Sequence, residues 1–302
     1  MFSFTKYSKL YYVFSGILTI LAIVSLVVFG LQFGIEFTGG SAMEVDFIGD
    51  RPSNQAITDA LSSLDLGEVV VQPVGSNGVV LRFKGVDEAT HQDILSKVKG
   101  LSDAQEVNFQ YVGPSIGNEL KRKTGIAIVL ALLAITIYIA FAFRKVSRPV
   151  SSWKYGVTSL LALFHDILIP LGVFAVLGKF YNAEITIPIV AALLTILGFS
   201  VHDTIVIFDR IRENLIKMGS DHFQETVDHS LNQTVGRSIS TVITVLLVMV
   251  SLFFFGGETL RWFSLALIIG VTSGAYSSIF IASPLLVTWQ KWSEKRRNRG
   301  KI

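Results

Sequence analysis

The sequence contains no cysteine and few charged residues. Without thiols the chain can form no disulfide, no thiolate nucleophile and no cysteine-ligated zinc or iron–sulfur site, although either redox compartment remains open. Charged residues make up 16% of the 302 residues, and hydrophobic residues make up 51%. Because soluble domains carry about 25% charged residues, this composition is typical of a membrane protein.

Signals for nucleotide chemistry are also missing. The chain has no G-x-x-x-x-G-K-[ST] phosphate loop, so we expect that it is not an ATPase and has no catalytic residues of its own. We also expect no cofactor and no bound metal. Work done by such a protein must draw on an ion gradient or on a partner.

Six apolar runs are long enough to cross a bilayer, which takes about 20 residues. The first exceeds a signal-peptide core and lacks an A-x-A cleavage site, so we predict an uncleaved helix. The chain is therefore predicted to be an α-helical polytopic membrane protein with both termini on one side. The runs cover residues 10–31, 124–143, 155–177, 185–208, 235–255 and 263–289.

Basic residues gather at the helix ends on the side of the termini. This placement favours membrane topology over nucleic-acid binding, and the positive-inside rule puts both termini in the cytoplasm. The basic tail, residues 291–302, is expected to contact lipid headgroups. Lys121-Arg122-Lys123 lies on the opposite flank, where long translocated domains escape the rule. The other basic residues are Lys6, Lys9, Arg144, Lys145, Arg148, Lys154, Arg210, Arg212 and Lys217.

An acidic insert, residues 33–120, separates the first two runs. Residues 34–120 hold 13 acidic and 5 basic side chains, whereas the remainder holds 10 and 21. Alternating hydrophobicity predicts strands at 42–49, 68–75, 78–85 and 106–112, and helical spacing predicts helices at 54–66 and 88–101. The order β-α-β-β-α-β predicts one α+β ferredoxin-like domain, external to the membrane, that acts as a binding surface or a spacer.

Two further helix faces follow from spacing alone. Phe223, Val227 and Leu231 recur every four residues, after Gly219 and Ser220, and predict a separate amphipathic helix at the cytoplasmic face, within about residues 217–234. On the last run a stripe of small residues lets another helix approach closely. This stripe is Ala266, Gly270, Gly274, Ser278 and Ala282.

The stretch 197–214, LGFSVHDTIVIFDRIREN, joins an apolar segment to a charge cluster. A carboxylate within a membrane helix, such as Asp203 beside His202, usually marks an ion or proton path; the alternative is a hydrogen-bonded tether between helices. Ser200, Asp203 and Thr204 share one helix face. The charge cluster at the cytoplasmic end is Asp209, Arg210, Arg212 and Glu213.

Arg237, near the start of the fifth run, is predicted to lie at the same depth as Asp203 if the two helices are antiparallel neighbours. Arginine keeps its proton in proteins, but by moving it can lower or restore the pKa of a carboxylate, as a gated proton site requires. A static buried ion pair is the alternative, and spacing alone does not decide between them.

His165 and Asp166 lie near the middle of the third run, the costliest depth for a charge. Histidine changes its charge near neutral pH, which suits a proton relay. Adjacent helical residues point about 100° apart, so we do not expect the two to serve one site in the same way. A tether between helices and a relay remain alternatives, and His202 ranks below both residues.

The connections to the insert carry glycine and proline. Gly39-Gly40, after Glu36, predicts a tight turn, and Gly113-Pro114 with Gly117 flanks the other side. We expect these two segments to act as hinges between the insert and the membrane helices.

Four segments resemble the SecF family of the bacterial Sec protein-export machinery, a branch of the SecD/SecF family related to RND-type exporters. They are FGIEFTGG at 33–40, HD at 165–166, the stretch 197–214 and LNQTVGRSISTVITVLL at 231–247. The family signature has Asp where this chain has Glu36. The resemblance implies an inner-membrane complex with SecD and the SecYEG channel, unfolded preprotein as substrate, and protons or Na⁺ as the coupling ion. It also implies proton-driven work at Asp203 and Arg237.

Two other functions compete with this interpretation. One is a membrane-anchored scaffold or chaperone module of the translocon that conducts no ions. The other is half of an RND-like exporter of small molecules, which a single small external domain and only six helices disfavour.

Overall fold

Six long apolar helices dominate the described part of the computed structural model, which comprises residues 2–144, 150–219 and 222–299. The six predicted spans are confirmed. Lys145, Arg148, Ser220 and the last residues of the basic tail lie outside the described residues. The helices are α1 (Ser8–Phe29), α5 (Pro114–Ala142), α6 (Ser152–Tyr181), α7 (Ile187–Met218), α8 (Phe223–Phe255), and the continuous run of α9 (Glu258–Ser277), the π-helical η2 (Ser278–Ala282) and α10 (Ser283–Arg299).

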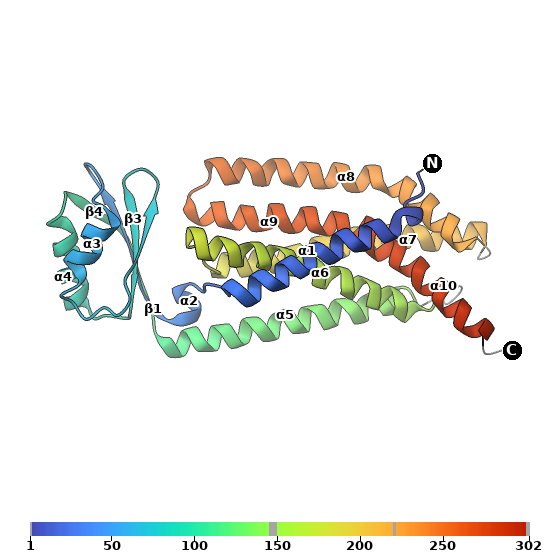
Figure 1. The fold of residues 1–302 in the computed structure, drawn as a ribbon, viewed down its shortest axis with the longest axis horizontal. Helices are drawn as coiled ribbons and strands as arrows, with labels where there is room; N and C mark the ends of the chain where they lie inside the picture. Colours follow the sequence, from blue (N-terminus) through green and yellow to red (C-terminus); the bar gives the residue numbers. More distant parts are fainter. Residues whose placement is uncertain (1, 145–149, 220–221, 300–302) are drawn as a thin grey trace. The chain divides into compact units, whose positions relative to one another are not determined.

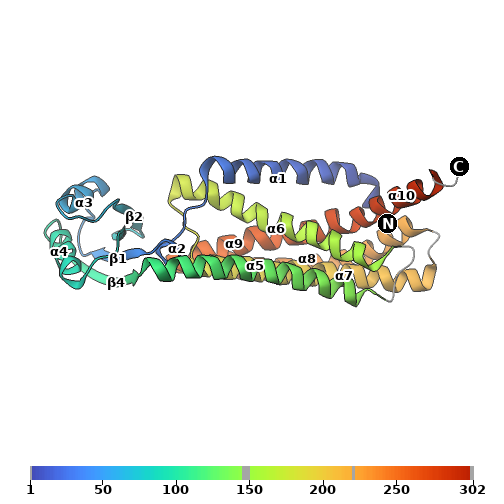
Figure 2. The same ribbon diagram turned by 90° about the horizontal axis from the view of Figure 1, so that it is seen from below.

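The chain divides into two compact units. The helical unit comprises Met1–Gly30, Ala127–Leu177 and Pro188–Ile302, and the outer unit comprises Leu31–Ile126 together with Gly178–Ile187. Within the helical unit the membrane helices run side by side, and α1 begins at the same end of the bundle at which α10 ends (Figures 1 and 2). A chain that crosses a bilayer an even number of times has both termini on the same side.

Helix α7 is buried along its length, and the small residues of α9 approach it closely. Buried side chains recur along α7 from Ile189 to Leu215. A Cβ atom placed on Gly274 would lie 2.9 Å from the Cβ of Ser200, and one on Gly270 would collide with the side chain of Ile196. The predicted small-residue stripe therefore packs against α7 within the bundle.

The outer unit contains a four-stranded antiparallel sheet with the strand order β2-β3-β1-β4. The strands are β1 (Gly40–Phe47), β2 (Val70–Val74), β3 (Gly78–Phe83) and β4 (Ala104–Val112), and helices α3 (Asn54–Leu61) and α4 (Glu88–Lys99) connect them in the order β-α-β-β-α-β. This order and pairing agree with the predicted ferredoxin-like arrangement.

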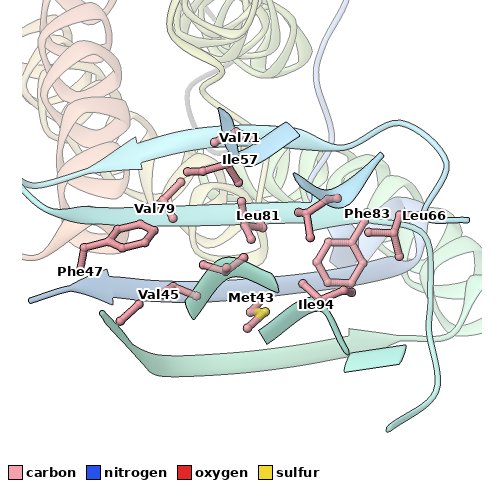
Figure 3. Packing of buried hydrophobic residues seen from close by; sticks show 13 residues of the cluster. Met43, Val45, Phe47, Ile57, Leu66, Val71, Val79, Leu81, Phe83 and Ile94 are labelled. Carbon is pink, nitrogen blue, oxygen red and sulfur yellow. The ribbon is translucent and has the colours of Figure 1, made fainter. Parts of the chain in front are cut away.

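One apolar core holds the sheet and its two helices together. Ile57 of α3 and Ile94 of α4 pack on Met43, Val45 and Leu81 of the central strands (Figure 3). Each helix begins at a side-chain cap, because Ser53 accepts a hydrogen bond from the Ala56 amide and Asp87 accepts one from the Thr90 amide. The sheet exposes two edges, β2 and β4.

The segment before the fifth span, which was predicted to lie at the cytoplasmic face, differs from the prediction. No separate amphipathic helix lies at the membrane face among the described residues, because α8 begins at Phe223 and continues unbroken to Phe255. The apolar stripe of Phe223, Val227 and Leu231 is buried in protein. Asn214 of α7 donates a hydrogen bond to Ser230 of α8 at 2.8 Å. A stripe that packs on protein has the same spacing as one that packs on lipid, so the sequence alone could not separate the two.

Gly274→Ala should lower the thermal stability of the chain in detergent, because the added methyl group meets Ser200 in a closely packed interface, at a cost of about 1–3 kcal/mol. Gly198→Ala is the matched control, since nothing lies within 4 Å of a Cβ at Gly198 on α7. Equal unfolding midpoints for the two variants would contradict the close approach of α9 to α7.

Candidate functional site

Asp203 of α7 lies buried in the helical unit with a single hydrogen-bonded oxygen. Ser238 of α8 donates to its Oδ1 at 2.5 Å, while Oδ2 is buried and has no hydrogen-bond partner among the described residues. The side chain is 8% exposed. A buried carboxylate that keeps one oxygen unsatisfied can take up a proton without breaking an existing contact.

The predicted contact between Asp203 and Arg237 is absent. Arg237 is exposed, and within the described residues it forms no ion pair. The expected depth agrees, since Ser238, the next residue, contacts Asp203. Because consecutive helical residues point about 100° apart, the face of α8 that presents Ser238 to Asp203 turns Arg237 away.

Polar residues line the exposed face of α8. Ser240, Thr241 and Thr244 lie there beside Arg237, and among the described residues their hydroxyl groups donate to backbone carbonyls of their own helix. His202 of α7 is exposed as well. A charge that faces lipid is costly, and Arg237, near the start of the span, lowers that cost by reaching a protein partner, water or the membrane interface.

A second buried carboxylate, Asp166 of α6, accepts several side-chain hydrogen bonds. Ser200 of α7 and Ser277 of α9 donate to its Oδ2 at 2.6 and 2.7 Å, and Ser273 of α9 donates to Oδ1 at 3.3 Å. Asp166 is 0% exposed. Its carboxylate therefore ties α6, α7 and α9 together.

His165 contacts the same carboxylate, so the two neighbouring residues meet at one place, where the expectation was only that they would not serve one site in the same way. Its Nδ1 lies 3.1 Å from Asp166 Oδ1, and its Nε2 is buried without a partner among the described residues. The contacts of the pair fit the tether between helices that was one of the two alternatives.

Helix α7 brings the two carboxylate sites within one turn of each other. Ser200 contacts Asp166, Asp203 follows three residues later, and Thr204 bonds Ser278 of η2 at 2.7 Å. The predicted polar face of Ser200, Asp203 and Thr204 is therefore buried as a unit. Within the described residues, no group of three or more His, Cys, Asp or Glu residues is arranged to hold a metal ion.

Sequence reasoning missed the hydroxyl partners Ser238, Ser273 and Ser277. Ser273 and Ser277 lie one turn apart on α9, and this spacing is the only available signal for a shared partner. Hydroxyl groups in membrane helices more often bond their own backbone, as Thr272 does to the Ile268 carbonyl. Spacing alone therefore could not single these serines out.

The charge cluster at the C-terminal end of α7 is held by local pairs. Arg210 contacts Glu213 at 2.5 Å and Gln233 of α8 at 2.5 Å, and Arg212 contacts Asp209 at 3.4 Å. The Arg210–Gln233 contact joins the C-terminal part of α7 to the N-terminal part of α8. We assign no chemistry to these contacts.

The two segments that were predicted to be hinges, Gly39-Gly40 and Gly113-Pro114 with Gly117, pack against each other within the outer unit. Gly39 and Gly40 have φ values of 76° and 128°, so the turn there requires glycine. Gly117 is helical, in the first turns of α5, and a Cβ on it would lie 2.9 Å from the Gly39 amide nitrogen. A Cβ on Gly39 would lie 2.8 Å from the Cα of Pro114. The glycines serve close approach of two chain segments, which is not the geometry of free hinges; a Cβ on Gly113 would make only an ordinary contact, with Tyr111 Oη at 3.9 Å.

Two family descriptions match most of the chain. The SecD/SecF GG motif matches residues 24–47, which include Glu36, Gly39 and Gly40, and the C-terminal region of the protein export membrane proteins SecD/SecF matches residues 91–292. The chain belongs to the SecD/SecF family. Within this family it is a SecF-type member, because its curated relatives are SecF subunits.

Relatives and solved structures agree with this assignment. The protein translocase subunit SecF of Thermobaculum terrenum is 40% identical over 96% of this chain and 94% of its own length. The SecF subunit of Vibrio alginolyticus is 37% identical over 93% of this chain and 88% of its own length. The crystal structure of SecDF, a translocon-associated membrane protein from Thermus thermophilus, matches with a TM-score of 0.86 and 32% identity over 96% of this chain. This chain spans only 39% of that SecDF chain.

Asp166→Asn should destabilise the chain in detergent by about 1–3 kcal/mol, because several buried donors lose a charged acceptor. Asp203→Asn, the matched substitution, should cost less, since one hydroxyl contacts Asp203 and one oxygen is free. Thermal unfolding of both variants measures the difference. An Asp203→Asn variant that is the less stable of the two would contradict the assigned contacts.

Proposed function

We propose that this chain works with SecD to use the proton motive force in the late translocation of preprotein through the SecYEG channel. The observation that carries the proposal is the state of Asp203. Its carboxylate is buried within a membrane helix, and one of its oxygens has no hydrogen-bond partner among the described residues. The neighbouring helix α8 carries Arg237 on its exposed face. The names of the relatives and the family match support the Sec pathway.

In this proposal Asp203 carries the proton and Arg237 sets when it does so. The described arrangement, with Ser238 on Asp203 and Arg237 turned away, suits a protonated carboxyl group. A rotation of α8 by about 100° would exchange Ser238 for Arg237 and favour the ionised form. Asp166 with His165 serves as a second proton holder on the α6 side of α7, and His202 ranks below them.

The exposed polar face of α8 is proposed to be covered by SecD. The chain spans two-fifths of the matched SecDF chain, so the remainder of such an assembly is available to shield Arg237. Apolar faces elsewhere on α1, α5 and α8 suit lipid. A partner that supplies polar groups at the depth of Arg237 would remove the cost of leaving that charge in lipid.

The proposed orientation places both termini in the cytoplasm and the outer unit outside the bacterial inner membrane. Lys6 and Lys9 at the start of α1 and the basic residues of α10 support it. The outer unit would hold unfolded polypeptide at a sheet edge, where an extended chain can add a strand. Of the two edges, β2 contains Pro73, whereas β4 is nine residues long and exposes Val107 and Tyr111.

Asp203→Asn should abolish gradient-driven export while leaving assembly intact, because the amide keeps the size and the Ser238 contact but holds no titratable proton. The measurement is preprotein transport in vesicles with an imposed proton gradient. The control is Asp209→Asn, which neutralises an exposed carboxylate six residues further along α7. Full export by Asp203→Asn would exclude the proton site and favour the passive scaffold.

Arg237→Lys should keep most of the export activity, whereas Arg237→Met should lose it. Within the described residues no carboxylate binds the guanidinium group through a two-pronged contact, so positive charge at this depth is the property required. Failure of Arg237→Lys in the same vesicle assay would show that a forked contact with a carboxylate forms during the cycle, because an ammonium group cannot replace it.

A further inference from the structure

The connection between α6 and α7 is bonded into the outer unit. The Gly34 amide donates to the Ile185 carbonyl at 3.0 Å, and the Ile185 amide donates to the Gln32 carbonyl at 2.6 Å. Phe33 and Ile185 form an isolated parallel bridge. Residues 182–186, which lead directly into α7, are therefore held by backbone hydrogen bonds to the segment that precedes Gly39-Gly40.

One ion pair joins the same connection to the sheet. Arg82 of β3 contacts Glu184 through Nε and Oε2 at 2.9 Å, and the two side chains are only 21% and 12% exposed. Arg82 is oriented from its other side by Gln72 of β2, which accepts a hydrogen bond from Nη1 at 2.6 Å. Glu184 thus meets the sheet through a guanidinium group whose position is fixed.

A second carboxylate converges on the same place. Gly34 is enclosed so tightly that a Cβ on it would collide with the Glu36 carboxylate and would lie 3.4 Å from Oε2 of Glu184. Glu36 belongs to the short helix α2 (Ile35–Thr38). Two carboxylates therefore lie beside Gly34 in a largely enclosed position, and Arg82 contacts one of them, so a bound proton would balance the remaining negative charge.

We propose that Glu36 and Glu184 form a proton-binding site, in which one proton neutralises the pair beside Arg82 and holds residues 182–186 on the outer unit. The lysines near this pair do not balance the second carboxylate charge in place of the proton. Lys121 of α5 lies over the ring of Phe33 at 4.6 Å, Lys84, which follows β3, pairs with Asp65, and Lys179 at the end of α6 is exposed.

The electrostatics of Glu184 agree with the geometry. Burial raises the pKa of Glu184, Arg82 opposes the shift, and Glu36 adds to it, so that the pKa reaches about 7. The ordinary value is 4.5. Since the state with the higher proton affinity is favoured as pH falls, acid favours the attached connection and alkali favours its release. Release increases from about pH 4.5 and levels off above about pH 7.

The experiment follows the exposure of the connection directly. Thr186→Cys gives the full-length chain a single thiol beside Gly34, and its rate of reaction with a membrane-impermeant maleimide is measured in nanodiscs between about pH 5 and about pH 8. The rate is divided by that of Ser76→Cys, an exposed thiol in the β2–β3 turn, which removes the intrinsic ionisation of the thiol. The assay contains no SecD, channel or gradient, so its outcome is separate from that of the export assays.

The normalised rate should rise several-fold with pH and level off near pH 7. Glu184→Gln, which mimics the protonated acid, should keep the rate low at every pH. Glu36→Gln, which removes the repulsion, should give a smaller rise that levels off at lower pH. The exposed control Glu68→Gln should match the parent. A flat or falling profile in the parent, or an unchanged profile in Glu184→Gln or Glu36→Gln, would overturn the proposal, and equal thermal midpoints check that the variants are folded.

Discussion

The helical unit depends on one constraint, which is that a bilayer offers no water to a buried carboxylate. Asp166 meets this constraint by accepting hydrogen bonds from three serines on two other helices. Each bond contributes about 1 kcal/mol, but leaving the carboxylate unsatisfied would cost several times that. The packing of α6, α7 and α9 around Asp166 is therefore linked to its hydrogen bonding: glycines on α9 permit the approach, and the approach brings the hydroxyls within reach.

Asp203 meets the same constraint incompletely, and this difference separates the two carboxylates. It lies one turn from Ser200 on α7 and has Ser238 as its hydroxyl partner, so one oxygen remains without a hydrogen bond. A fully bonded carboxylate is stabilised in its charged form, whereas a half-bonded one in an apolar setting gains more from a proton. This difference in contacts is why the proposed function assigns the proton first to Asp203, whereas the contacts of Asp166 suit a tether.

Hydrophobic length and alternation were sufficient to predict the six spans, the β-α-β-β-α-β order and the buried face of α7. What they could not predict is rotation about a helix axis. Arg237 and Ser238 are neighbours in sequence, and only the packing of α8 decides which of them faces Asp203. The same ambiguity affects Phe223, Val227 and Leu231, whose spacing fits a lipid surface as well as the flank of α7. The contact of Glu184 with Arg82 was invisible for another reason, since 102 residues separate the two partners in the chain.

The outer unit shows why glycine should not be equated with flexibility. Gly39 and Gly117 each approach the backbone of the other segment so closely that a side chain would not fit. Helix α5 then runs without a break from Pro114 to Ala142, so the junction and the second membrane span form one continuous element. Residues 182–186 are held in the same unit by backbone bonds and by the contact of Glu184 with Arg82. Of the two connections, this one has an ionisable contact, and in the proposal above a bound proton strengthens its attachment.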